Sequence, residues 1–234
     1  MDLLNIVRVS VVIISMVAAS HLVDQMTDKQ VSRLHHDQVK LLNKDPRQGE
    51  VMCTRLAKEP YFGVEMLVGP TWRIYYSWNM DLQNQCLDMV FRNATPQVVR
   101  RIFNDMNEYL ETEPYWDAAT VLVSMGRARH EMLLFADQGA AGRFQGVPNV
   151  IRDGSITPAR KTVPLLQFHL KLMYGGKYLL MADCQIGVTT LSVRRRSVPY
   201  RAEIGGIADS LDFGAGLHAC QSDKRKEEGV ATKQ

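Results

Sequence analysis

Apolar residues recur at helical spacing after Thr95 and give the clearest secondary-structure signal in the chain. Thr95 suits an N-cap, and Pro96 suits the first helical position. Glu113-Pro114 stops the pattern. The apolar positions share one helix face: Val98, Val99, Ile102, Phe103, Met106, Tyr109 and Leu110. This spacing predicts an amphipathic helix over 95–110 that covers a sheet.

Alternating residues predict strands elsewhere. Trp72, Ile74, Tyr76 and Trp78 are spaced two apart, as in a half-buried strand whose aromatic side is core beneath the predicted helix. The whole stretch Val51–Arg92 is therefore expected to be rich in strands.

Two hairpins are predicted from turns that contain glycine. The first spans Ala118–Phe135 around Gly126-Arg127, and the second spans Leu165–Ile186 around Gly175-Gly176, a favoured two-residue loop. Val188–Val193 adds one further strand candidate.

The register of the second hairpin separates its side chains into two faces. One face is apolar and holds Leu170, Leu172, Leu179 and Met181. Asp183 falls opposite Phe168 on this apolar face, whereas His169 points to the other face. A carboxylate on the apolar face must be exposed at the sheet end, paired, or shifted in pKa.

These elements favour an α+β fold, with a mainly antiparallel sheet and one covering amphipathic helix, preceded by an N-terminal helix. Asp137–Pro164 and Gly205–Leu217 are rich in glycine and are expected to be irregular. The expected organisation is a leader over 1–20, an N-terminal helix over 21–46, an α+β domain over 47–221 and a disordered tail over 222–234.

The first twenty residues have the layout of a secretory signal peptide. A weakly basic start precedes the mostly apolar run Val9–Ala19, and small residues follow at Ala18-Ala19-Ser20. A membrane anchor is the alternative, with membrane contact through the N-terminus. The predicted location is therefore periplasmic or extracellular.

Four cysteines, Cys53, Cys86, Cys184 and Cys220, follow this leader. In an oxidising compartment they are expected to form two disulfides, and four cysteines allow three pairings. No CxxC motif or Cys/His cluster has metal-ligand spacing, so neither a metal nor a cofactor is expected.

Basic residues are concentrated between Arg143 and Arg201. This segment contains ten basic and only two acidic residues, so its net charge is +8, whereas the net charge of the whole chain is +3. This segment predicts contact with an anionic partner, although a solvated face remains the alternative. A nucleic acid is not expected, because the basic residues are not interleaved with aromatic ones in a base-stacking pattern and the predicted compartment is the wrong one for it. The candidate contact residues are Arg143, Arg152, Arg160, Lys161, Arg194, Arg195 and Arg196.

No catalytic motif is present, and only weak candidates exist: Asp183, His169 and His130. The sequence therefore favours an exported binding protein of the cell envelope, whose partner is a protein or an anionic envelope component, over an enzyme. Two alternatives stay open. One is a secreted hydrolase with a dispersed active site, and the other is a membrane-anchored scaffold of an envelope or secretion machine.

Overall fold

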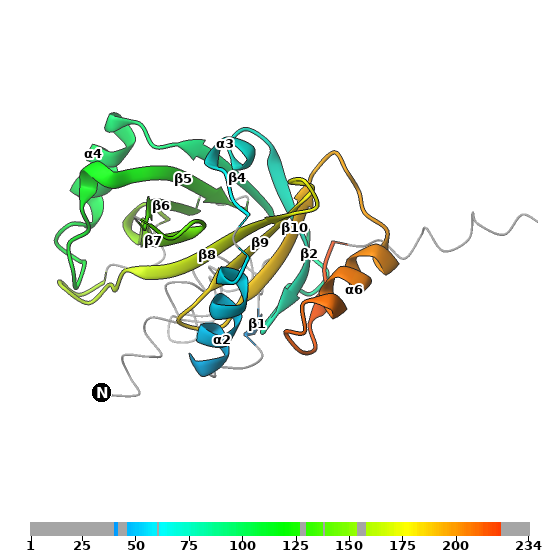
Figure 1. Ribbon diagram of the computed structural model, residues 1–234. Coiled ribbons are helices and arrows are strands. Elements are labelled where there is room, and N and C mark those ends of the chain that lie inside the picture. The colour runs from blue at the N-terminus through cyan, green and yellow to red at the C-terminus, as the bar shows by residue number, and fades with distance from the viewer. Residues whose placement is uncertain are drawn as a thin grey trace, which may run out of the picture.

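The computed structural model describes residues 40–41, 46–59, 61–126, 130–137, 139–153 and 158–220. Eight antiparallel strands form one continuous sheet, and its last strand pairs with its first, so that the sheet closes into a barrel (Figure 1). The strands in spatial order are β2 (Thr71–Trp78), β4 (Asp88–Asn93), β5 (Ala119–Met125), β6 (His130–Ala136), β7 (Arg143–Pro148), β8 (Leu166–Met173), β9 (Tyr178–Asp183) and β10 (Thr189–Arg194).

The barrel overturns the expected α+β fold with one covering helix. Each strand pairs with the next along the chain, which is an up-and-down topology, and β10 then pairs antiparallel with β2. Local patterns predict strands and hairpins but not this closing pair, because its two strands lie more than a hundred residues apart. Closure also removes both exposed edges that an open sheet would present.

Side chains alternate between the interior and the outer surface of the barrel. The strand β2 breaks this alternation by a bulge: Leu191 pairs with Tyr76, whereas Ser192 pairs with Ile74. Trp72 and Ile74 consequently belong to the interior cluster, and Tyr76 and Trp78 belong to the outer one. The predicted single aromatic face is therefore divided between two cores.

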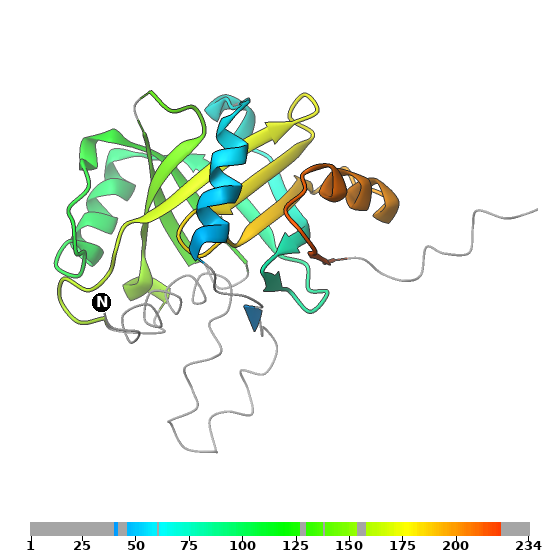
Figure 2. The ribbon, with the colours of Figure 1, turned by 60° about the horizontal axis from the view of Figure 1, so that its bottom comes forward.

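Helices cover the outside of the barrel rather than one face of an open sheet (Figure 2). The helix α4 (Pro96–Met106) confirms the predicted amphipathic helix, and the Thr95 hydroxyl accepts a hydrogen bond from the amide of Val98. Its buried side chains Ile102 and Met106 pack in a cluster with outward residues of β5 to β7.

Two other helices replace structures that the sequence patterns predict differently. The helix α2 (Pro46–Ala57) occupies part of the expected strand-rich stretch, and α6 (Arg201–Ser210) occupies part of the expected irregular region. In α6, Ile204, Ile207 and Ala208 are buried against the barrel. This packing outweighs the low helix propensity of its two adjacent glycines.

Short elements complete the fold: α3 (Val64–Leu67), η2 (Trp116–Ala118), α5 (Val150–Asp153), β11 (Leu217–His218), and β1 (Lys40–Leu41), which pairs with β3 (Met80–Asp81). The strand β1 replaces the end of the predicted N-terminal helix. The strand β7 and α5 replace part of the irregular stretch 137–164.

The leader, the rest of the N-terminal helix and the tail lie outside the described residues. No helix within the described ranges is long and apolar enough to cross a membrane.

All four cysteines form disulfides, as expected, with the pairing Cys53–Cys184 and Cys86–Cys220. The bridges span 131 and 134 residues. In the chain-entropy model a loop of this length is worth about 5 kcal/mol. Two disulfides indicate an oxidising, extracytoplasmic environment.

Gly49 permits the close approach of α2 to the turn between β9 and β10. A Cβ atom at position 49 would lie 2.6 Å from the carbonyl oxygen of Cys184 and 2.7 Å from the amide nitrogen of Gly187. Because both are backbone atoms, we expect Gly49→Ala to lower the free energy of unfolding by about 1–3 kcal/mol. Urea unfolding with intact disulfides measures this loss.

The matched control is Gly206→Ala, in α6, where a Cβ atom meets nothing within 4 Å. We expect this variant to gain about 0.5–1 kcal/mol, because alanine restricts the unfolded chain. Equal midpoints for the two variants would contradict the close packing at Gly49.

Candidate functional site

Asp183 is a buried carboxyl group on the inner side of the barrel wall. It ends β9 and pairs with Phe168, as the hairpin register predicts. Only 3% of the residue is exposed. Its Oδ1 atom accepts hydrogen bonds from the backbone amides of Gln185 at 2.8 Å and Ile186 at 3.1 Å. Its Oδ2 atom has no hydrogen-bond partner among the described residues.

Burial raises the pKa of Asp183 to about 7, although the two backbone amides act in the opposite direction. The surrounding interior is apolar and includes Phe144, Phe168 and Met181. Near neutral pH the carboxyl group is therefore divided between its protonated and ionised forms. In either form, Oδ2 can take one further hydrogen-bonding partner.

His169 is buried on the other side of the wall, in β8, with 1% of the residue exposed. Neither ring nitrogen has a hydrogen-bond partner within the described part of the chain. Burial lowers the pKa of His169 to about 4, and the charges of Arg143 and Lys171 contribute in the same direction. The imidazole is therefore neutral at physiological pH.

The three weak catalytic candidates do not converge on one site. Asp183 belongs to the inner face, and His169 belongs to the outer face, as the alternation predicts. His130 pairs with Met125 at the start of β6, and β6 is next to neither β8 nor β9 in the barrel wall. Among the described residues, no three His, Cys, Asp or Glu side chains gather to hold a metal ion.

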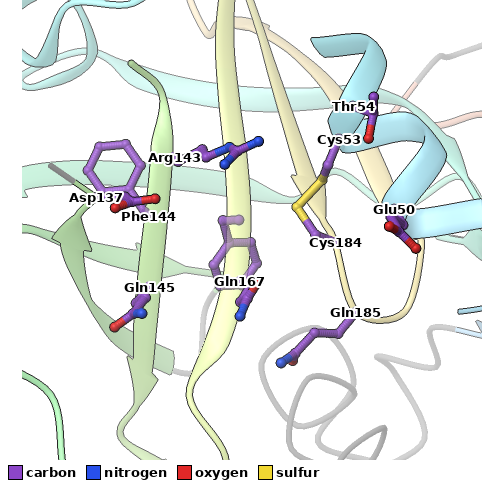
Figure 3. A pocket seen from close by; sticks show the side chains of 11 residues that line it. Glu50, Cys53, Thr54, Asp137, Arg143, Phe144, Gln145, Gln167, Cys184 and Gln185 are labelled. Carbon is purple, nitrogen blue, oxygen red and sulfur yellow. A yellow bond between two sulfur atoms is a disulfide. The ribbon is translucent and has the colours of Figure 1, made fainter. Parts of the chain in front are cut away.

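A groove of about 600 Å³ lies on the outside of the barrel, between α2 and the strands β7 and β8 (Figure 3). Its polar lining includes the guanidinium of Arg143 and the side chains of Glu50 and Asp137. Gln185 also lines it, and its Oε1 atom has no hydrogen-bond partner among the described residues. No sequence motif indicates this groove, because α2 itself is not predicted.

The basic residues of the Arg143–Arg201 segment are distributed over different parts of the barrel. Arg143 lies in the groove. Three others lie near α4. Arg152 pairs with Glu131 of β6, which also pairs with Arg101 of α4. Arg160 pairs with Glu108, and Lys161 donates to the carbonyl of Asn107, both just after α4.

Only Arg194, Arg195 and Arg196 stay together, at the end of β10. The Arg194 guanidinium lies 5.6 Å from the ring centre of Trp72, and Arg195 lies 3.6 Å from the carboxylate of Asp88. Their role as contact residues stays a prediction.

Comparison with protein-family models and with curated proteins finds no match for this chain.

The buried acid and the buried base oppose each other in the pH dependence of stability. The pKa of Asp183 rises from 3.8 to about 7 on folding, so its contribution to stability is greatest below pH 4 and is lost as the pH rises to about 7. The pKa of His169 falls from 6.5 to about 4, so its contribution is present above pH 6.5 and is lost as the pH falls to about 4.

We therefore expect the contributions of Asp183 and His169 nearly to cancel in the wild type between pH 4 and 6.5. In Asp183→Asn the contribution of His169 is no longer opposed. The free energy of unfolding of this variant should therefore rise with pH by up to about 3 kcal/mol. His169→Leu should show the opposite slope. Urea unfolding at several pH values measures both. If both variants keep the wild-type profile, the two groups do not titrate as their burial requires.

Proposed function

We propose that this protein is an exported binding protein that holds one small ligand inside its barrel. An eight-stranded barrel is just wide enough to be filled by side chains or to hold one small ligand, as in lipocalins and streptavidin. Ligand sites in such proteins occur in the mouth of the barrel. The disulfides support export to the periplasm or the cell exterior, where the predicted leader would direct the chain.

The unpartnered Oδ2 atom of Asp183 carries this proposal. An unsatisfied carboxyl oxygen in an apolar interior costs free energy that an apolar residue at the same position would avoid. Strongly perturbed buried acids are more frequent at functional sites than elsewhere. A ligand with an apolar body and one N–H or O–H donor would satisfy Oδ2 and exclude water from the interior.

The interior supplies side chains that can make room for such a ligand. The interior cluster contains four methionines from the barrel strands, Met89, Met125, Met132 and Met181, together with Met80 of β3. Methionine is unbranched and has three rotatable bonds, so it repacks around guests of different shape more readily than Val or Ile. We infer that ligand entry requires these side chains to move, because buried residues pack the interior of the barrel.

The outer groove is a second candidate site for the same binding role. Arg143 offers a cation there, and Gln185 offers an unpartnered carbonyl oxygen. The groove also includes Arg143, one of the contact residues that the charge pattern of the sequence predicts. It would suit a polar partner, such as an exposed segment of another protein, rather than an apolar ligand.

The interior site is tested with 1-aminoanthracene, a fluorescent probe with an apolar body and one amine. We expect the wild type to bind the probe with increased fluorescence. Asp183→Asn replaces the Oδ2 acceptor with a donor, so the dissociation constant should increase about tenfold. Anthracene lacks the amine, and its affinity should be unchanged by the substitution.

Two matched variants separate the sites. Asp212→Asn removes a carboxylate that is 87% exposed, and Arg143→Gln alters the outer groove. Neither should change the affinity for the probe. The interior site is ruled out if the wild type does not bind 1-aminoanthracene or if Asp183→Asn binds it as tightly as the wild type.

A further inference from the structure

Exposed apolar side chains gather at the end of the barrel where β10 finishes. Tyr200 is 74% exposed, Tyr174 is 65% exposed and Val198 is 59% exposed. They are three of the four most exposed large hydrophobic residues in the described part of the chain. The remaining one is Tyr115. Isolated exposed residues are common, but a group of them marks an interaction surface.

The fold joins the two segments that carry these residues. Tyr174 begins the turn between β8 and β9, and its ring centre lies 5.7 Å from that of Tyr178. The Tyr178 hydroxyl donates a hydrogen bond to Glu203, in the first turn of α6, and Lys177 lies 2.6 Å from the same carboxylate. Tyr200 immediately precedes this helix. Figures 1 and 2 both show the turn beside the segment that leads into α6.

Positive charge surrounds the exposed apolar residues. Arg195 shares the carboxylate of Asp88 with Arg73. Arg196 and Arg201 are exposed, and neither forms an ion pair with a described residue. Glu203 is neutralised by Lys177, which leaves Glu65, in α3, as an exposed acid near this end. The surface defined by Tyr174, Arg196, Val198, Tyr200 and Arg201 is therefore both apolar and cationic.

We propose that this surface docks on a membrane that contains anionic phospholipids. Tyrosine has an apolar ring and a polar hydroxyl, and it is enriched at membrane–water interfaces for that reason. Arginines next to such residues are attracted by anionic headgroups, at about fivefold in affinity for each charge. Val198 favours a lipid over a sulfated glycan, because a glycan offers no apolar phase for it. This inference does not depend on the interior site.

The test is sedimentation of the full chain with lipid vesicles at low salt. We expect binding to vesicles of phosphatidylcholine with about one-third phosphatidylserine, and little binding to phosphatidylcholine alone. Arg196→Ser with Arg201→Ser should lower the partition coefficient about 30-fold, as two charges predict. Val198→Ser with Tyr200→Ser should lower it about tenfold through lost apolar burial.

Matched controls use residues on the opposite side of the barrel, where α4 lies (Figure 1). Arg92→Ser with Arg100→Ser removes the same charge from two exposed arginines, and Tyr115→Ser removes a tyrosine that is 71% exposed. Neither control should change vesicle binding. The proposal is overturned if the wild type does not bind the anionic vesicles, if the controls weaken binding as much as the surface variants do, or if only heparin is bound.

Discussion

Pairing between β10 and β2 is the constraint on which the rest of this structure depends. It converts a chain of consecutive hairpins into a closed wall, and closure gives each strand a definite inner and outer side. The bulge opposite Leu191 and Ser192 allows β2 to meet this register. Because of it, one aromatic strand supplies the interior with Trp72 and the outer surface with Trp78. The separation of an apolar interior from helix-covered outer clusters follows from this single pairing.

The wall places two buried titratable groups on opposite sides. Asp183 faces the interior and His169 faces outward, and burial favours the neutral form of both. A direct acid–base pair between them would require both side chains on one face, which a strand with alternating side chains does not provide. The geometry therefore supports a binding role for Asp183 more than proton transfer between the two residues.

Local patterns predicted the local structure well and the global structure poorly. Thr95 and Pro96 marked the beginning of α4, and the glycines at 175 and 176 set the register that places Asp183 opposite Phe168. These features depend on neighbouring residues. Barrel closure, the helix α6 and the pairing of the cysteines depend on segments far apart in the chain. The buried position of Asp183 was foreseeable from its hairpin, whereas the groove beside α2 was not, because it forms only when that helix packs on the barrel.

The two disulfides have a consequence for the integrity of the chain after cleavage. Both bridges enclose the whole interval from Cys86 to Cys184, which contains most of the barrel strands. Hydrolysis of any one peptide bond within this interval leaves two fragments that remain joined by two covalent links. In surroundings rich in proteases, a nicked molecule would still hold its strands at the high effective concentration of a single chain.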